Sequence, residues 1–506
     1  MIHTPPVVDV IIVGAGFAGL GMGIRLSRET DTSFLILERA DDVGGTWRDN
    51  TYPGVACDIP SHLYSFSFRQ KPDWSHVFAP GAEIQEYLRE CAREEGLLPR
   101  IRFGAEVHEM RWDEIDGLWV VVTEAATYRA RSLVVAAGRL SEARTPAVDG
   151  AETFTGTSFH SSHWDHQTKF DGKRIGVVGT GASAIQIVPR LAERAAELVV
   201  FQRSAPYIVP RVDRAYSETE KRLFTIDPTV RDDLRSRFFW AAEEGFAQRI
   251  GVGDRIEALR NLAHANLETH ITDPSLRERA TPTYEIGCKR VLISSDFYPA
   301  LGQENVTLED SALTQIVGSR ALAESGNGYD LDILVYATGF STIRPAFAER
   351  VIGVGGMRLS DHWSNGMTAF ASTVVSGYPN LFIIDGPNAS LGHNSGIYMI
   401  ETQIEYVLGA LAFLSEDADR VLEISASAER SYTREIDRMS ASTVWLQGGC
   451  TSWYVDSATN RLTLLWPDFA HSFREANGRF DPVPYDSSSD PFEPRERGAV
   501  VASRAI

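Results

Sequence analysis

The sequence has little cysteine and no closely spaced cysteine pair. Four cysteines occur in 506 residues, and they lie far apart, at Cys57, Cys91, Cys288 and Cys450. This spacing argues against a disulfide scaffold, a zinc ribbon and a redox dithiol, and it favours a reducing compartment. Cys288, although it stands beside Lys289, is expected to pack as a small hydrophobic side chain.

Long apolar runs and an excess of positive charge are also lacking. The first apolar stretch, 7–24, contains Asp9 and has no basic segment before it, so we expect no signal peptide. No run of about 18 apolar residues follows, which predicts no membrane span and a cytoplasmic location. The net charge of −19 disfavours binding to nucleic acid or to an anionic membrane. A chain of this length predicts two or more domains.

A glycine-rich turn follows the first apolar run. Residues 9–13, DVIIV, have the composition of a strand buried on both faces, and they lead into Gly14, Gly16 and Gly19 with the spacing G-x-G-x-x-G. In a dinucleotide-binding fold, these glycines allow a tight turn, close approach of a pyrophosphate and close packing of the next helix. A second apolar strand ends at Glu38, where a carboxylate can bind an adenosine ribose. A chance glycine-rich loop is the alternative.

The same pattern recurs in the second quarter of the chain. Residues 174–178, RIGVV, precede a turn whose candidate binding residues are Gly179, Thr180, Gly181, Ser183 and Ala184. Arg203 then occupies the strand end that corresponds to Glu38. An acid there repels a 2′-phosphate, whereas Arg203 and Ser204, with Lys289 in the same half of the chain, can bind one. The second unit should therefore prefer NADPH to NADH, unless Arg203 is a surface residue placed there by chance.

The order of these segments predicts an α/β protein with two Rossmann-like dinucleotide-binding domains. Apolar strands that end near Gly138 and Phe340 suggest where the chain leaves the first domain and returns to it. We therefore expect one domain over 1–145 and 341–506 and a second over 146–340. Residues of about 212–285 are charged and poor in strand formers, which predicts a helical insertion. The tail after Arg479 is expected to wrap the surface or to be disordered.

A long motif lies between the two glycine turns. It has the form F-x-G-x-x-x-H-x-x-x-W-D and contains Phe154, Gly156, His160, Trp164 and Asp165. This motif resembles the fingerprint of Baeyer-Villiger monooxygenases. The related N- and S-oxidising flavin monooxygenases share only its front part. Ser161 stands where family members commonly carry Thr, and this exchange retains the hydroxyl.

A second motif of the same family, G-x-W-x-x-x-x-Y-P-G-x-x-x-D, precedes the first. It contains Gly45, Thr46, Trp47, Tyr52, Pro53, Gly54 and Asp58. Segment 288–301 resembles the family linker that carries the active-site arginine, which would be Arg290, with Lys289 reaching the NADPH phosphate. By the same resemblance, Tyr64 and Trp453 would contact a cofactor. The chain is most similar to the type I, 4-hydroxyacetophenone-oxidising subgroup of these class B flavoproteins, without its N-terminal extension, and the resemblance covers nearly the whole length.

The resemblance implies a monooxygenase that binds FAD and NADPH. With O2 it would convert a small-molecule ketone to an ester or lactone through a flavin C4a-peroxide, and sulfoxidation is a further activity it allows. Arg290 would stabilise the peroxide anion and the oxyanion of the addition intermediate, Asp58 would orient Arg290, and His160 would join the two domains. An ordinary ion pair at a domain seam is the alternative for Arg290 and Asp58.

Other functions remain open at this level. An N- or S-hydroxylating flavin monooxygenase is the nearest competitor, and a non-catalytic flavoprotein is a more distant one. His160, His163 and His166 recur at three-residue intervals, but no carboxylate cluster flanks them, so we expect no metal site. The protein could be a monomer or a homodimer.

Overall fold

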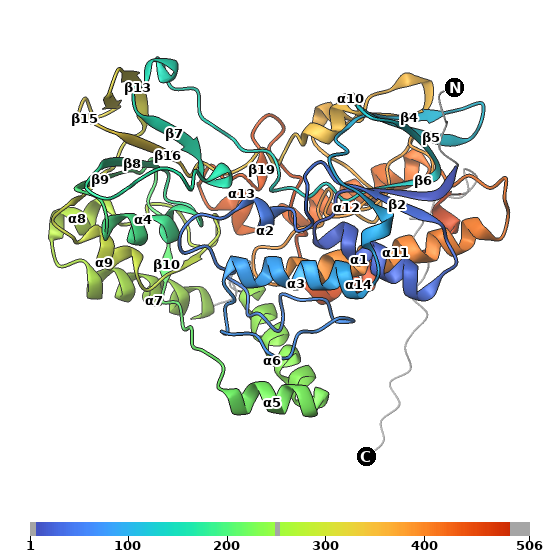
Figure 1. Cartoon of the computed structure of the whole chain (residues 1–506), viewed down its shortest axis with the longest axis horizontal. Helices are drawn as coiled ribbons and strands as arrows, with labels where there is room; N and C mark the ends of the chain where they lie inside the picture. Colours follow the sequence, from blue (N-terminus) through green and yellow to red (C-terminus); the bar gives the residue numbers. More distant parts are fainter. Residues whose placement is uncertain (1–6, 248–253, 486–506) are drawn as a thin grey trace.

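The computed structural model describes residues 7–247 and 254–485, and these form two lobes joined along a central seam (Figure 1). Each lobe is built around its own sheet, one with eight strands and one with five. Smaller two- and three-stranded sheets complete the structure.

The first sheet has the strand order β17-β4-β5-β6-β1-β2-β3, and β18 also pairs with β6. Its strands are β1 (Val8–Val13), β2 (Phe34–Leu37), β3 (Ile101–Arg102), β4 (Val107–Asp113), β5 (Leu118–Thr123), β6 (Thr127–Val135), β17 (Val351–Ile352) and β18 (Leu381–Ile383). β1 pairs in parallel with both β2 and β6, and the centre of β1 is completely buried, as its β-branched composition requires. The helices of this lobe are α1 (Phe17–Glu29), α2 (Thr46–Asp49), α3 (Gly81–Glu94), α10 (Leu359–His362), α11 (Gly396–Ser415), α12 (Ala426–Ser440), α13 (Val444–Gln447) and α14 (Ala470–Asn477).

The second sheet is entirely parallel, with the order β12-β9-β8-β16-β7. Its strands are β7 (Thr157–His160), β8 (Arg174–Val178), β9 (Glu197–Phe201), β12 (Val306–Glu309) and β16 (Ile333–Tyr336). The helices α4 (Ala184–Ala192) and α9 (Phe297–Leu301) pack on it. A small antiparallel sheet of β13 (Leu313–Val317), β14 (Arg320–Ala323) and β15 (Gly328–Asp330) lies at the outer end of this lobe (Figure 1). Both lobes are therefore Rossmann-type units.

Two chain crossings join the lobes. The segment that leaves β6 and the segment that leaves β16 meet in an antiparallel bridge between Ala143 and Phe340. The backbone N–H of Arg144 also donates to the carbonyl of Gly339 at 2.9 Å. The first sheet is therefore assembled from both ends of the chain, with the second sheet inserted between β6 and β17.

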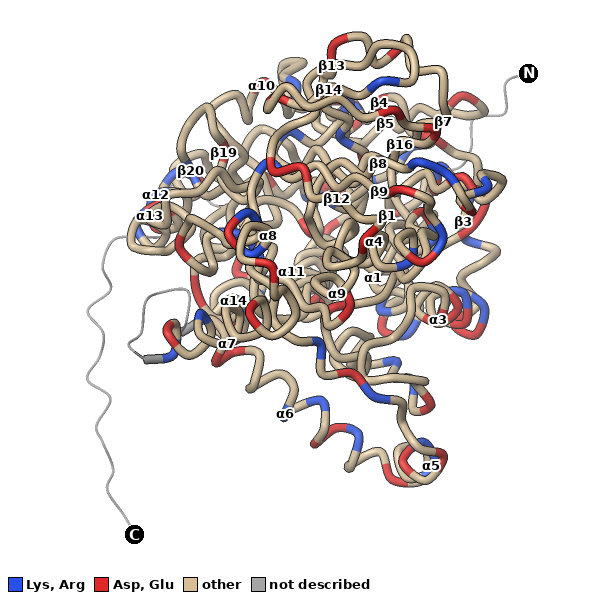
Figure 2. The backbone as a smooth tube through the Cα atoms, turned by 90° about the vertical axis from the view of Figure 1, so that its left-hand side faces the viewer, with Lys and Arg blue, Asp and Glu red and all other residues tan. Residues whose placement is uncertain are grey.

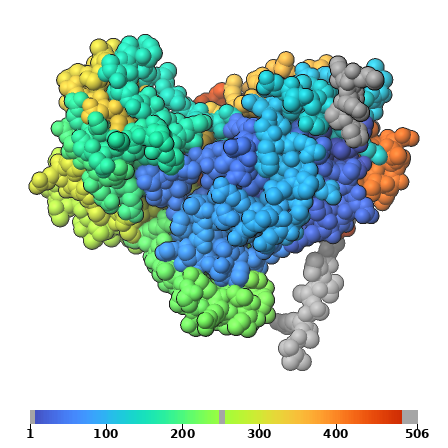
Figure 3. Space-filling view, in the orientation of Figure 1, coloured from blue at the N-terminus to red at the C-terminus, as the bar shows by residue number. Residues whose placement is uncertain are grey.

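A group of helices lies between β10 (Ile208–Val209) and β11 (Leu292–Ile293), which pair in parallel. These helices are α5 (Glu218–Ile226), α6 (Pro228–Ala247), α7 (Asp254–His270) and α8 (Pro274–Arg279). Helix α5 begins with a capping box in which Ser217 and Glu220 exchange hydrogen bonds. The α5–α6 region projects below the two lobes (Figures 1 and 3). Acidic and basic residues are interspersed along these two helices (Figure 2).

Helix α11 is long and apolar enough to cross a membrane by length and composition, and it is the one such helix among the described residues. In the structure 67% of its most apolar window is buried, and the helix packs against α1 and α14. It is a core helix in this fold. After α14, Tyr485 packs on this helix through a 2.7 Å hydrogen bond between its hydroxyl and that of Tyr406. The expected surface or disordered tail lies, beyond Tyr485, outside the described residues.

Candidate active site

The first glycine turn lies at the end of β1, where it lines a narrow space. Gly14 has φ +107, and a Cβ there would lie 2.5 Å from the carbonyl oxygen of Ala136, the residue after the neighbouring strand β6. A Cβ at Gly19 would lie 1.8 Å from the carbonyl oxygen of Gly14. A side chain at either of these two positions would clash with the protein backbone, so the fold requires glycine there with or without a ligand. Gly16 differs, because a Cβ there would meet nothing closer than the Cα of Gly45 at 3.8 Å.

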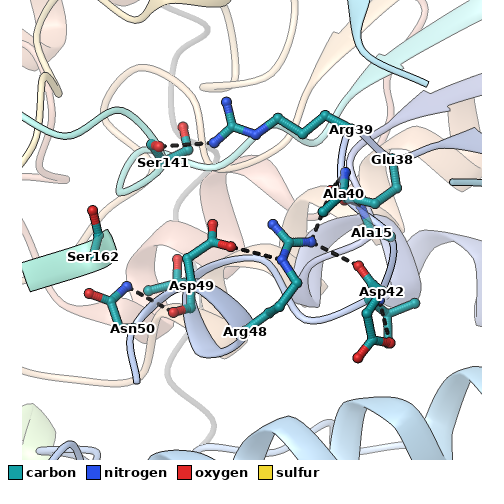
Figure 4. A network of polar contacts seen from close by, with 12 residues as sticks. Ala15, Glu38, Arg39, Ala40, Asp42, Arg48, Asp49, Asn50, Ser141 and Ser162 are labelled. Carbon is teal, nitrogen blue, oxygen red and sulfur yellow. Dashed lines mark hydrogen bonds and ion pairs between the residues drawn. The ribbon is translucent and has the colours of Figure 1, made fainter. Parts of the chain in front are cut away.

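The carboxylate of Glu38 lies beside this turn and is buried (Figure 4). It accepts hydrogen bonds from the backbone N–H of Ala15 at 2.8 Å and of Ala40 at 3.0 Å. The guanidinium of Arg48 donates to the same carboxylate at 2.9 Å. Glu38 was predicted from the sequence to lie here, but Arg48 was not. Arg48 lies one residue after the tryptophan of the second motif. The ion pair supplies both a negative and a positive group at the edge of the turn.

The second glycine turn repeats this geometry in the other lobe. Gly179 has φ +108, and a Cβ there would lie 2.6 Å from the carbonyl oxygen of Ala337, the residue after β16. A Cβ at Gly181 would meet no atom within 4 Å. Ser183 and Ala184 follow at the start of α4. In each turn the first glycine is enclosed, whereas a Cβ at the next glycine, Gly16 or Gly181, would meet no atom closer than 3.8 Å. The backbone there is accessible where a pyrophosphate would bind. The residues present fit two dinucleotides.

A cluster of cationic and hydroxyl groups lies next to the second turn. Lys289 Nζ donates to Ser204 Oγ at 2.6 Å, and Thr180 Oγ1 donates to the carbonyl of Ser204 at 3.3 Å. Burial and the charge of Arg203 lower the pKa of Lys289. The structure therefore brings Lys289 next to Arg203 and Ser204, from which it is distant in sequence. Two cations and a hydroxyl form a suitable site for a phosphate.

Arg290 and Asp58 form an ion pair at the seam between the lobes. The Nε and Nη2 atoms of Arg290 both lie 2.7 Å from Oδ2 of Asp58. Burial opposes the charged guanidinium, but the carboxylate of Asp58 outweighs it, so that the pKa of Arg290 is raised above its ordinary value. Arg290 is therefore fixed in its charged form.

The loop that carries Asp58 is held by the second lobe. Gln186 of α4 donates to the carbonyl of Ala56 at 3.0 Å and accepts from the hydroxyl of Tyr52 at 3.2 Å. Gly54 has φ +83, and a Cβ there would lie 2.9 Å from the carbonyl of Gln186. The tyrosine and glycine of the second motif thus fit this loop against α4.

The other residues of that motif lie on the first lobe. Gly45 has φ +53 and faces Gly16, and Thr46 begins helix α2. Trp47 Nε1 donates to the hydroxyl of Tyr64 at 3.3 Å, and the two rings pack edge to face. Burial raises the pKa of Tyr64. Trp47 and Tyr64 are therefore mutually packed aromatic groups behind the glycine turn.

His160 lies at the end of β7, close to the chain crossing. Its ring is 5.6 Å from that of Phe340, and its Nδ1 accepts from the backbone N–H of Ser162 at 3.1 Å. Burial lowers the pKa of His160, which favours the neutral imidazole at pH 7. This placement next to Phe340 suits a role in the connection between the lobes.

The remaining residues of the first motif form the local structure of the second lobe. A Cβ at Gly156 would lie 2.3 Å from the carbonyl of Asp332. Trp164 is buried against Phe170 in a stacked pair, and Asp165 caps a turn by accepting from Thr168 Oγ1 at 2.6 Å. Phe154 is partly buried and packs against the hydrophobic core between the five-stranded sheet and the β13–β15 sheet. The structure does not place these side chains beside Arg290.

The expectation that Cys288 is an unpaired packing residue is wrong. Cys288 and Cys450 form a disulfide with a Cα–Cα distance of 6.2 Å across a sequence separation of 162 residues. Sequence spacing could not reveal this pair, because the fold brings the two segments together at the seam. Cys57 and Cys91 are unpaired and buried. Trp453, three residues after Cys450, is 39% exposed.

Sequence reasoning also missed the ion pair between Arg139 and Asp385. Arg139 directly follows the strand end at Gly138, which was the signal available in the sequence. Burial and the charge of Arg290 lower the pKa of Arg139 to about 10, so it remains charged at neutral pH. Its Nε is buried and has no hydrogen-bond partner among the described residues, which is consistent with a polar ligand at this position. Arg139 is a second cation at the seam.

The described part of the chain contains no group of three or more His, Cys, Asp or Glu side chains arranged to hold a metal ion. His166 instead makes a 2.8 Å hydrogen bond to Thr51.

Two dinucleotide turns in separate Rossmann-type lobes, one with a phosphate-binding cation cluster, define an oxidoreductase that uses two dinucleotides. Residues 11–220 match the family model described as pyridine nucleotide-disulphide oxidoreductase. A Baeyer-Villiger monooxygenase of Streptomyces coelicolor is 41% identical over 480 residues, which cover 94% of this chain and 92% of the relative. One from Pseudomonas aeruginosa is 40% identical, over 95% of this chain and 92% of the relative.

Solved structures agree with these relatives. Cyclohexanone monooxygenase from Rhodococcus sp. Phi1, bound to NADP+, superposes with a TM-score of 0.83 at 28% identity and covers 93% of this chain and 97% of its own. The OTEMO complex with FAD and NADP has a TM-score of 0.82 at 26% identity, with the same coverage of both chains. The chain therefore belongs to the Baeyer-Villiger monooxygenases. It is an NADPH-dependent flavin monooxygenase whose cofactors are FAD and NADP(H).

Proposed function

We propose that this protein converts ketones to esters or lactones with NADPH and O2, at the seam where Arg290 meets Asp58. Its membership in the family supports the reaction type, and one structural neighbour is a cyclohexanone monooxygenase with the cyclic ester ε-caprolactone bound. The observation that carries the proposal is the fixed positive charge of Arg290 at the seam between the two lobes, each of which carries one glycine turn. A cytoplasmic location is part of the proposal.

Each lobe would hold one cofactor. FAD would bind to the domain formed by 1–145 and 341–506, with its pyrophosphate at Gly16 and its ribose beside Glu38. NADPH would bind to the domain over 146–340, with its pyrophosphate at Gly181 and its 2′-phosphate among the cations next to Ser204. When bound, these cofactors supply the two electrons and the activation of O2. Trp453, at the edge of the seam, would contact a cofactor from the C-terminal segment.

Arg290 would bind the negative charge that develops on the carbonyl oxygen of the ketone. A guanidinium suits this task because it stays charged and presents several donors in one plane. Asp58 would hold that plane in position and prevent Arg290 from turning toward bulk water. Arg139, paired with Asp385, would keep its own charge beside the same space. His160 would maintain the connection between the two lobes without transferring a proton.

The test is ketone-dependent NADPH consumption with the product mass recorded, for the wild type, Arg290→Ala and Arg290→Lys. We expect a product heavier by one oxygen from the wild type, and about 10²–10³-fold slower product formation in Arg290→Ala, as for the loss of an oxyanion-stabilising donor. Arg290→Lys should recover only part of the rate, because it restores the charge without the planar donor geometry. Ester formation at the normal rate in Arg290→Ala would contradict this assignment. Oxygenation of amines or sulfides alone would identify an N- or S-hydroxylating enzyme.

A further inference from the structure

The disulfide between Cys288 and Cys450 joins two segments that both border the seam. Cys288 directly precedes Lys289 and Arg290, and it is completely buried. Cys450 is only half-buried and stands three residues before Trp453. A single covalent bond therefore connects the segment of the catalytic arginine to the C-terminal segment.

Other contacts show that the two segments are fitted to each other. The backbone N–H of Glu285 donates to the carbonyl of Gly448 at 3.1 Å. A Cβ at Gly448 would lie 2.8 Å from Cβ of Cys288, so the disulfide is accommodated by the absence of a side chain there. The charge of Arg290 also interacts with Tyr454, which follows Trp453. Movement of either segment would therefore change the position of Arg290.

The same segment also reaches the phosphate site. Lys289 donates to Ser204 Oγ at 2.6 Å, and Arg290 pairs with Asp58 on the opposite side. Residues 288–290 thus contact both lobes within three positions. A covalent bond at Cys288 restricts how far this segment can shift.

We propose that Cys288 and Cys450 are a reversible redox pair whose disulfide form holds Lys289 and Arg290 in the geometry that binds NADPH. This inference rests on the proposed roles of those two residues. The half-buried Cys450 is the thiol that meets the oxidant, and Cys288 is the thiol that resolves it. Opening of the disulfide frees the segment at 288–290 and weakens the NADPH site first.

Hydrogen peroxide is the oxidant in this proposal. The Cys450 sulfur attacks one peroxide oxygen, the O–O bond breaks, and the departing hydroxide takes up the thiol proton and leaves as water. Cys288 then attacks the Cys450 sulfenic acid, the S–O bond breaks, and a second water leaves with the Cys288 proton. Two thiols lose two electrons and two protons, and one peroxide becomes two waters. A dithiol reductant reverses the change by thiol–disulfide exchange.

The chemical part is tested on the whole holoenzyme by peptide mass spectrometry without reduction. After hydrogen peroxide, we expect a linked peptide that contains Cys288 and Cys450, and after a dithiol we expect both cysteines to be alkylated on unfolding. Cys57 and Cys91 serve as internal controls, because both are buried and unpaired and should never appear in a linked peptide. Failure to find the linked peptide after peroxide would overturn the proposal.

The functional part compares NADP+ affinity of the resting enzyme with no ketone turnover, so that its outcome does not depend on the oxygenation activity. Reduction of the wild type, or Cys450→Ser, should raise the Kd for NADP+ about fivefold, the lower end of typical coupling between sites. Hydrogen–deuterium exchange should become faster at 284–292 and 448–456. Cys91→Ser is the matched control and should respond to reduction as the wild type does. Equal affinity and exchange in the oxidised and reduced enzyme would contradict the proposal even if the linked peptide forms.

Discussion

The role that we propose for Asp58 depends on its position relative to Arg290, because two donor atoms of the guanidinium, Nε and Nη2, converge on one carboxylate oxygen. In Asp58→Ala, the guanidinium keeps its charge but loses its partner. We expect product formation from a ketone to fall about 10²-fold, the cost of a misplaced catalytic group. NADPH oxidation without ketone should change less, so the two rates must be measured on the same preparation.

Asp58→Asn is the control for this variant. An asparagine keeps the shape and one acceptor oxygen, and it should lie between the wild type and Asp58→Ala in product yield per NADPH. Identical yields in all three proteins would show that the pair is only a structural ion pair at the seam.

We expect Arg203 and Lys289 to determine the preference for NADPH over NADH. Arg203→Ala should raise the KM for NADPH about tenfold, since a charged hydrogen bond is worth about 1.5–3 kcal/mol. The KM for NADH should stay unchanged, because NADH has no 2′-phosphate. Steady-state kinetics with both coenzymes check this.

The matched control for Arg203 is Arg194→Ala. Arg194 is a surface arginine that pairs with Asp171 away from the turn, at 2.7 Å. The Arg194→Ala substitution should leave the KM values for NADPH and NADH unchanged. A rise in the KM for NADH equal to that for NADPH in Arg203→Ala would mean that Arg203 does not bind the extra phosphate.

Local patterns were sufficient for some of these residues and insufficient for others. The glycine turns and Glu38 could be predicted because their spacing within one strand–turn–helix unit is set by backbone geometry. The family was predicted from two motifs, and the cofactors from these motifs together with the glycine turns, Glu38 and Arg203. The relatives and solved structures confirm the family and both cofactors. The pair of Arg139 with Asp385 and the disulfide depend on how distant segments meet, and one sequence without its fold does not contain that information.

At the scale of elements, Glu243 of α6 connects the inserted helices to the first lobe. Burial alone would raise the pKa of this carboxylate, but hydrogen bonds from His393, Asn394 and His471 outweigh burial and lower it from 4.5 to about 2. Asn394 donates at 2.7 Å and His471 Nδ1 lies at 2.6 Å. The folded protein therefore binds fewer protons at this group than the unfolded chain.

Because the folded protein binds fewer protons at Glu243 than the unfolded chain, its free energy of unfolding decreases as the pH falls. The stabilisation by Glu243 is fully present above about pH 4.5 and is lost as the pH falls toward about 2. Glu243→Gln should lower the melting temperature at pH 7, because hydrogen bonds to a charged group are worth about 1.5–3 kcal/mol. Thermal unfolding between pH 7 and pH 3 should show a weaker acid dependence in the variant than in the wild type. Parallel curves for the two proteins would contradict this assignment.

Elements were predictable where a single face or period determines them. The buried strands β1 and β8 follow from continuous β-branched runs, and the charged stretch before β11 does contain helices. Helix α11 escaped notice as a core helix because Glu401, Gln403 and Glu405 interrupt its apolar run. Its burial comes from packing between α1 and α14, which is a tertiary property.

At the scale of the whole molecule, the two lobes should bind their cofactors separately. Gly16 and Gly181 occupy equivalent positions in the two turns. A Cβ at Gly16 would meet nothing closer than the Cα of Gly45 at 3.8 Å, and a Cβ at Gly181 would meet no atom within 4 Å. Gly16 has φ −81, which a residue with a Cβ can adopt. Valine at either position should therefore permit folding but fill the space that a pyrophosphate requires.

Each of the variants Gly16→Val and Gly181→Val serves as the control for the other. Gly16→Val should purify without the visible absorbance of bound flavin. Gly181→Val should keep its flavin and raise the KM for NADPH at least about tenfold, because the backbone amides lose their close approach to the pyrophosphate. Flavin content, circular dichroism and NADPH kinetics are measured together on both proteins. If Gly181→Val also lost its flavin while remaining folded, the two lobes would not be independent binding units, and the assignment of one dinucleotide to each would be wrong.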